Sequence, residues 1–202
     1  MSHANTHVAI GVIVTGIFSI FIPLNALTFF LAVCGAFAQD CDFILSKYAP
    51  EENHRRLLTH TIWPGLAAMA IGGIAEIPWI IIAGINSLVH IFFDCLDWGT
   101  TIIGGKQLRG PRLLYRGVNL EYHELKEKYQ EHTVCYFTLR WYRNRVMQCI
   151  EGGSIAGMVI MFLLLNTPGI WWGILPYLGF MLLHYTTWVR CARWCKQQTS
   201  AL

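Results

Sequence analysis

The chain has 202 residues, of which 54% are apolar and 13% are charged, and its formal net charge is +3 at pH 7. Soluble domains usually carry about 25% charged residues, and the mean hydropathy here is +0.43. The composition therefore excludes an ordinary soluble protein and indicates an integral membrane protein. The first residues lack the Lys/Arg-rich start of a secretory signal, so we expect none.

Six apolar runs follow one another along the chain. They cover residues 8–22, 26–38, 61–75, 77–93, 154–166 and 170–189. The runs form three pairs, and a short turn joins the two members of each pair. These turns contain Pro23, Glu76 and Pro168. The second run is short for a membrane span, which needs about 20 residues. We expect an all-α, polytopic helical membrane protein with about six membrane segments in three hairpins, plus an amphipathic interfacial helix.

The basic residues define an orientation for these runs. All 15 Lys and Arg residues lie between the second and third runs, between the fourth and fifth, or after the sixth. The three opposite turns carry none. Because Lys and Arg accumulate in cytoplasmic loops, we expect a multi-pass protein of the inner (plasma) membrane with both termini in the cytoplasm.

Residues 119–148 have apolar side chains at helical spacing, and their acidic residues precede their basic ones. This pattern predicts a helix that lies on the inner leaflet and contacts anionic lipid head groups. The alternative is a connector that is held by packing against other helices. We expect no nucleic-acid partner, since membrane proteins carry such basic residues for topology alone.

The chain has seven cysteines. The number is odd, and none belongs to a CxxC pair. Most lie near the basic ends of the runs, where a cytosolic location would keep them reduced. We therefore expect free thiols.

Histidine and aspartate gather at the basic ends of the apolar runs. His90 and Asp94 close the fourth run, and a spacing of four places both on one face of a helix. A histidine and a carboxylate buried there are costly unless something neutralises them, and a metal ion would do so. The other ends supply His7, Asp40, Asp42, His54 and His60.

Neutral imidazoles and carboxylates suit zinc, with manganese or iron as alternatives. The set exceeds the needs of one tetrahedral site, which favours two zinc ions with Asp94 as the bridging carboxylate. The sequence leaves open whether Asp40 or Asp42 is the direct ligand, and what His3 and His184 do. We expect Asp97 to cap its helix or to pair with a Lys or Arg.

Four motifs occur in order: THVAIG at 6–11, QDCD at 39–42, HRRLLTHT at 54–61 and HIFFD at 90–94. Together they resemble the YdjM-like inner-membrane proteins, which are classed as metal-dependent hydrolases. Gln39 and Arg116 stand where that family usually has proline. The resemblance covers roughly residues 3–116. It implies a metal-ligand set of His7, Asp40, Asp42, His54, His60, His90 and Asp94.

The same short motifs are distantly similar to those of zinc-dependent phospholipase C and P1-type nucleases, which implies phosphoester hydrolysis. We expect a membrane-embedded hydrolase that acts at the cytoplasmic face on a phosphoester of a lipid or lipid-linked substrate. Its catalytic residues would be Asp42, His60 and Asp94, and Arg55, Arg56 and Arg116 would bind the substrate phosphate.

Two alternatives remain open. One is a non-catalytic scaffold or regulator with a structural metal site. The other is a metal or proton transporter, which should place its ionisable groups nearer the midplane. We expect the chain to comprise three regions. They are a hydrolase-like membrane core at 1–116, the interfacial helix at 117–150, and a C-terminal hairpin with a basic tail at 151–202.

Overall fold

The computed structural model describes residues 4–105, 107–115, 122–129, 132–165 and 168–200. Over this part of the chain the regular structure is helical, apart from one isolated bridge between Thr100 and Arg109. The α-helices are α1 (Ala4–Ser19), α2 (Ala26–Cys34), α3 (Ile62–Ile74), α4 (Pro78–Asp97), α5 (Tyr122–Tyr129), α6 (Thr133–Arg143), α7 (Arg145–Leu165) and α8 (Pro168–Ser200). The 3-10 helices are η1 (Ala38–Tyr48), η2 (Pro50–Glu52), η3 (His54–Arg56), η4 (Leu58–His60) and η5 (Leu113–Tyr115).

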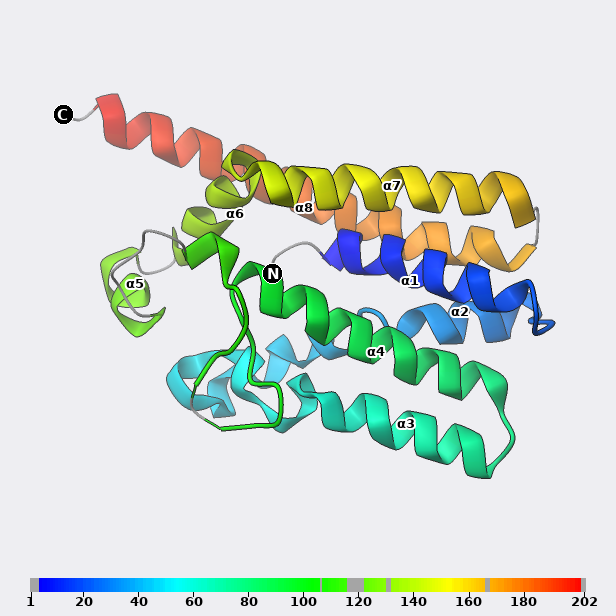
Figure 1. Ribbon diagram of the computed structural model, residues 1–202. Helices are drawn as coiled ribbons and strands as arrows, with labels where there is room; N and C mark the ends of the chain where they lie inside the picture. The colour runs from blue at the N-terminus through cyan, green and yellow to red at the C-terminus, as the bar shows by residue number, and fades with distance from the viewer. Residues whose placement is uncertain (1–3, 106, 116–121, 130–131, 166–167, 201–202) are drawn as a thin grey trace.

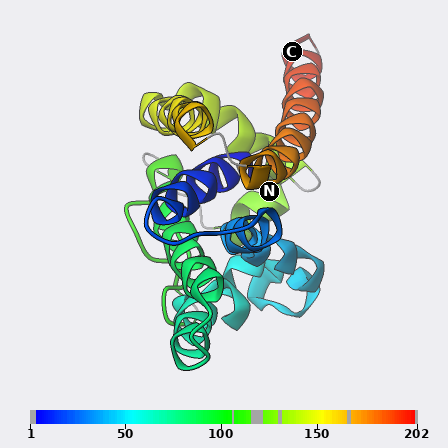
Figure 2. The same cartoon turned by 90° about the vertical axis from the view of Figure 1, so that its right-hand side faces the viewer.

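Helices α1, α2, α3, α4, α7 and α8 run side by side along the long direction of the molecule (Figure 1). Viewed from the end, α7 and α8 lie on one side, α1 and α2 in the middle, and α3 and α4 on the other side (Figure 2). The core of the bundle lies where α1 and α2 meet α7 and α8. It contains Val8, Ala9, Val12, Phe29, Val33, Met158, Met161, Ile170 and Tyr177.

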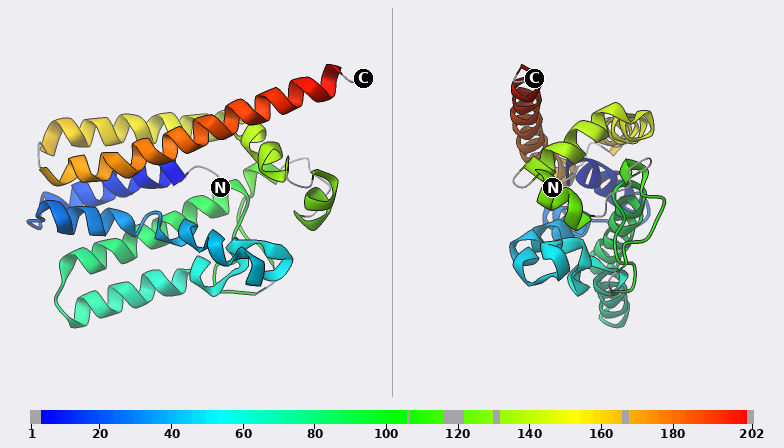
Figure 3. Two further views of the ribbon diagram at one scale, coloured as in Figure 1. Left: turned by 180° about the vertical axis from the view of Figure 1, so that it is seen from behind. Right: turned by 90° about the vertical axis from the view of Figure 1, so that its left-hand side faces the viewer.

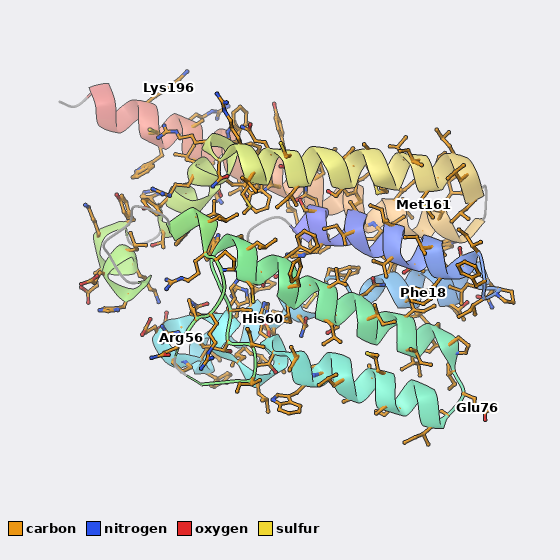
Figure 4. The ribbon with its side chains drawn as sticks, in the orientation of Figure 1. Phe18, Arg56, His60, Glu76, Met161 and Lys196 are labelled. Carbon is orange, nitrogen blue, oxygen red and sulfur yellow. A yellow bond between two sulfur atoms is a disulfide. The ribbon has the colours of Figure 1, made fainter. Side chains whose placement is uncertain are left out.

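The two ends of the bundle differ. Phe18, Glu76 and Met161 lie toward the end that carries the short turns, whereas Arg56, His60 and Lys196 lie toward the opposite end (Figure 4). The 3-10 helices, α5 and α6 gather at that second end (Figure 3). Polar and basic groups are therefore brought together at one end, which we call the basic end.

Three helical stretches are long and apolar enough to cross a membrane: Ala26–Tyr48, Pro78–Asp97 and Arg145–Leu165. The apolar helices α1 and α3 are shorter. These lengths agree with a membrane protein but do not by themselves establish six spans. The predicted run at 26–38 ends as an α-helix at Cys34, and from Ala38 the chain continues as the 3-10 helix η1.

The single helix predicted for residues 119–148 is wrong. The structure divides this stretch into α5 and α6, and from Arg145 the chain already belongs to α7. Phe137 and Trp141 of α6 are buried against Trp98 at the end of α4, in a second apolar cluster. Since these aromatic side chains pack against other parts of the protein, the structure favours the alternative prediction, a connector that is held by packing against other helices.

The prediction of free thiols is wrong for two of the cysteines. Cys135 of α6 and Cys191 of α8 form a disulfide across 56 residues of sequence. Neither residue belongs to a short motif, so only the packing of α6 against α8 could reveal the pair. A disulfide is unusual in a reducing cytosol. The cytoplasmic orientation of the basic end therefore remains a prediction.

Removal of this disulfide should destabilise the oxidised protein. Because a cross-link restricts the unfolded chain, Cys135→Ser and Cys191→Ser should each lower the free energy of unfolding by roughly 2–4 kcal/mol. Thermal unfolding with and without reductant measures this loss, and Cys149→Ser is the matched control because Cys149 is free and exposed. Unchanged unfolding of the wild-type protein in reductant would contradict the cross-link.

Candidate metal centre

Asp94 lies at the centre of the polar cluster at the basic end. It is fully buried on the last turns of α4. Its Oδ2 lies 2.7 Å from His60 Nε2 and 3.4 Å from His90 Nε2. Its Oδ1 lies 3.1 Å from His7 Nε2 and 2.8 Å from Arg55 Nη2. One carboxylate thus contacts side chains from α1, η3, η4 and its own helix.

A backbone carbonyl from the segment after α2 orients the ring of His90. His90 Nδ1 lies 2.7 Å from the carbonyl oxygen of Ala36, so Nδ1 carries the proton and donates it to that carbonyl. This contact requires the end of α2 to approach α4 closely. Gly35 permits the approach, because a Cβ at this position would lie 2.1 Å from the carbonyl oxygen of Ala83.

The second nitrogen of His90 faces carboxylates. In the neutral imidazole Nε2 then presents a lone pair, and Nε2 lies 3.4 Å from Asp94 Oδ2 and 3.8 Å from Asp40 Oδ1. Among the described residues it has no hydrogen-bond partner, although His90 is only 1% exposed. A lone pair that faces two buried carboxylates is unfavourable, and either a proton on Nε2 or a metal cation between the three groups relieves it.

Four donor groups surround this point. Ligand atoms of Asp40, His60, His90 and Asp94 all lie within 4.8 Å of one another, and all four residues are buried. With metal–ligand distances of about 2.0–2.1 Å, the donors of a tetrahedral zinc site lie about 3.3 Å apart. The 3.4 Å separation of His90 Nε2 and Asp94 Oδ2 fits this spacing. The 2.7 Å separation between His60 Nε2 and Asp94 Oδ2 is shorter, so these two atoms would have to move apart when a metal ion binds.

His60 is oriented by groups on both sides. Its Nδ1 lies 3.3 Å from Asp42 Oδ1, and Asp42 Oδ2 in turn accepts a hydrogen bond of 2.7 Å from Thr59. Metal-binding histidines commonly donate their second ring N–H to a carboxylate in this way. The geometry therefore separates the two aspartates: Asp40 belongs to the four-donor group, and Asp42 orients His60.

The pKa values of His60 and His54, on the short 3-10 helices η4 and η3, are shifted in opposite directions. Burial alone would lower the pKa of His60, but its hydrogen bonds to Asp42 and Asp94, together with the charges of Asp94 and Asp40, outweigh burial and raise the pKa to about 9. Burial, together with the charges of His60 and Arg55, lowers the pKa of His54 to about 3. The carboxylates thus stabilise a positive charge at His60, either on its protonated ring or on a bound metal ion. His54, by contrast, stays neutral at pH 7.

Two of the predicted ligands lie beside the four-donor group. The imidazole of His7 contacts Asp94, and its ring centroid lies 4.0 Å from that of His90. The ring of His54 lies 5.1 Å from that of His60, and His54, His60 and Asp42 form a second possible group. Because His60 belongs to both groups, the second would have to share this residue with the first.

Arg55 has partners inside the protein. Its side chain is buried, with Nη1 2.5 Å from Asp97 Oδ1 and Nη2 2.8 Å from Asp94 Oδ1. Although burial lowers it, the pKa of the guanidinium is raised above its ordinary value by these two carboxylates. The expected pairing of Asp97 with a basic residue is confirmed. Arg55 therefore supports Asp94, and we do not retain it as a substrate ligand.

The other predicted substrate ligands are placed differently. Arg56 Nη1 lies 2.7 Å from Glu51 Oε1 nearer the surface. Arg116, like the proposed boundary between 116 and 117, lies outside the described residues. Sequence reasoning missed the carbonyl oxygens of Gln39 and Ala36, which contact His60 and His90. Every residue has a backbone carbonyl, so the residue types alone do not predict which carbonyl acts as an acceptor.

Loss of the Arg55 charge should be strongly destabilising. Arg55→Met leaves Asp94 and Asp97 buried without their cation, which should lower the free energy of unfolding by about 3–5 kcal/mol. Arg56→Met is the matched control and should cost about 0–1 kcal/mol, because the pair with Glu51 is near the surface. Denaturant unfolding in detergent measures both. Equal losses for the two variants would show that the buried ion pairs do not hold the site.

Comparison with known proteins does not identify a function for this chain. No family model, no curated protein and no solved structure matches the chain. The resemblance of its four motifs to the YdjM-like family therefore remains a prediction. The described structure itself shows that buried histidine and aspartate groups at the basic end could hold a metal ion.

Proposed function

We propose that this protein is a metal-dependent hydrolase of a phosphoester in a membrane lipid or lipid-linked substrate. The observation that carries the proposal is the buried group of Asp40, His60, His90 and Asp94. Its donors are the imidazole nitrogens and carboxylate oxygens that zinc prefers, with manganese or iron as alternatives. A metal ion held there would supply an activated water and polarise a phosphoryl oxygen.

The chain's own residues have distinct roles in this proposal. Asp94 and His60 hold the metal, and Asp42 orients His60 through the contact of 3.3 Å. Arg55 and His7 contact Oδ1, the other oxygen of Asp94, and hold the carboxylate in place. With Arg55 on that side, one metal ion fits the geometry better than a pair bridged by Asp94. Arg56 remains the proposed ligand for the substrate phosphate.

The proposed membrane arrangement follows from the two ends of the bundle. Helices α1, α2, α3, α4, α7 and α8 would cross the membrane as three hairpins, so that both termini and the metal centre share one side. The gathering of the basic residues supports the inner membrane and a cytoplasmic location for that side. Anionic lipid head groups would contact the same end.

Burial of the site favours a second candidate. Asp94 and His60 are 0% exposed and His90 is 1% exposed. A structural metal site is closed, whereas a catalytic one keeps a position for water or substrate. A membrane scaffold or regulator that uses the metal for stability is therefore the alternative, and turnover separates the two.

Metal analysis tests the centre that both candidates share. The purified protein should hold about one transition-metal ion per chain, as a site of this composition predicts. His90→Ala should lose the metal, because it removes a donor, and His123→Ala should keep it, since His123 is exposed. A metal content that is the same in wild type and His90→Ala would contradict the site.

Activity assays decide between enzyme and scaffold. The metal-loaded protein should hydrolyse a member of a panel of phospholipids and soluble phosphodiesters. Asp94→Asn should reduce that rate by about a hundredfold or more, since Asp94 orients and charges the centre. A metal-loaded wild-type protein that is inert toward the whole panel would favour the scaffold.

A further inference from the structure

A cavity of about 60 Å³ lies beside the metal centre, between the start of α1, η1 and α8. It is lined by Ala4, Asp40, Cys41, Phe43, Phe180, Leu183, His184 and Thr187. Most of the lining is apolar, and the polar groups include one member of the four-donor group. The cavity therefore connects the proposed centre with the C-terminal hairpin, which the sequence motifs do not include.

Asp40 provides this connection. Its Oδ1 lies 3.8 Å from His90 Nε2 at the metal centre, and its Oδ2 is buried without a hydrogen-bond partner among the described residues. The side chain is 9% exposed, and Asp40 lines the cavity. An unpaired carboxylate oxygen at this depth is costly, so a proton donor or a cation that enters the cavity would find an unsatisfied acceptor beside the centre.

The outer part of the cavity is exposed and apolar. Phe43 of η1 is 42% exposed and Leu183 of α8 is 59% exposed. Exposed apolar side chains continue from both, with Ile44 on η1 and Leu182 on α8. In the proposed membrane arrangement, such surfaces would face hydrocarbon rather than water.

A second hollow competes as an access route. It has a volume of about 340 Å³ and is lined in part by Asp42, Thr59 and Ser87. Both oxygens of Asp42 already have partners, in Thr59 and His60. A ligand there would meet a satisfied carboxylate that lies behind His60, whereas the cavity at Asp40 offers an unsatisfied one.

We propose that the cavity between η1 and α8 is a lateral portal for the apolar chain of a membrane lipid. The chain lies against Phe43, Phe180 and Leu183, and the lipid's phosphoester head reaches the metal centre at Asp40. This inference rests on the proposed hydrolase function and deepens it, because it assigns the substrate to the bilayer and its path to the C-terminal hairpin. His184 and Thr187 are then the polar residues beside the head group.

Cys41 offers a probe of the portal that does not depend on activity. It is a free, exposed cysteine in the cavity lining, and Cys149 on α7 is a second exposed thiol outside the lining. The metal-loaded full chain is placed in phosphatidylcholine vesicles and treated with a maleimide that carries a long acyl chain. A charged, water-soluble maleimide is used in parallel. Mass spectrometry then gives the labelling of Cys41 relative to Cys149.

Leu183→Trp should narrow the portal without disturbing the fold, because this position is 59% exposed. We expect it to reduce acyl-maleimide labelling of Cys41 by about tenfold, which corresponds to about 1.4 kcal/mol. Leu182→Trp is the matched control: it is the neighbouring leucine, 62% exposed and outside the lining, and it should leave labelling unchanged.

The outcomes separate the portal from the hydrolase. Faster labelling of Cys41 by the acyl reagent than by the charged one, with a loss only in Leu183→Trp, supports the portal whether or not turnover is seen. Equal labelling by both reagents, or no effect of Leu183→Trp, overturns it even if the protein hydrolyses soluble phosphodiesters. Metal content should stay at the wild-type level in both variants, since neither touches a donor.

Discussion

The carboxylate of Asp94 is the contact on which the rest of the basic end depends. It is fully buried, and it receives His7, Arg55, His60 and His90 from four separate segments. Among the described residues four buried aspartates, at 40, 42, 94 and 97, face one buried arginine, which leaves a formal charge of −3 when the aspartates are ionised and the histidines are neutral. Buried charges need compensation, and a divalent cation at the four-donor group would supply two of these three charges.

The helical framework explains how these groups reach one place. Gly35 lets α2 approach α4, and the Ala36 carbonyl then fixes the proton of His90 on Nδ1. At the end of α4, Gly99 adopts a left-handed conformation and its N–H binds the Asp94 carbonyl, which ends the helix where Arg55 can reach the carboxylate. The 3-10 helices between α2 and α3 deliver His60. The apolar helices thus position a polar centre at their shared end.

The sequence predicted the gathering of these residues because charge placement and run lengths determine which helix ends share a side. It could not assign their roles. Asp40 and Asp42 are two residues apart in a 3-10 helix, and only the structure shows that one faces His90 and the other His60. Arg55 resembled a substrate ligand because burial cannot be read from a loop sequence. The Cys135–Cys191 disulfide depends on tertiary packing across 56 residues, which no local pattern encodes.

The central claim is that Asp40, His60, His90 and Asp94 hold a metal ion at the basic end. X-ray absorption at the metal edge of the purified protein tests it most directly, because the spectrum reports the donor atoms. The account predicts nitrogen and oxygen neighbours at about 2.0–2.2 Å, with imidazole scattering and no sulfur. A shell with sulfur at about 2.3 Å, or a protein that retains no metal, would contradict it.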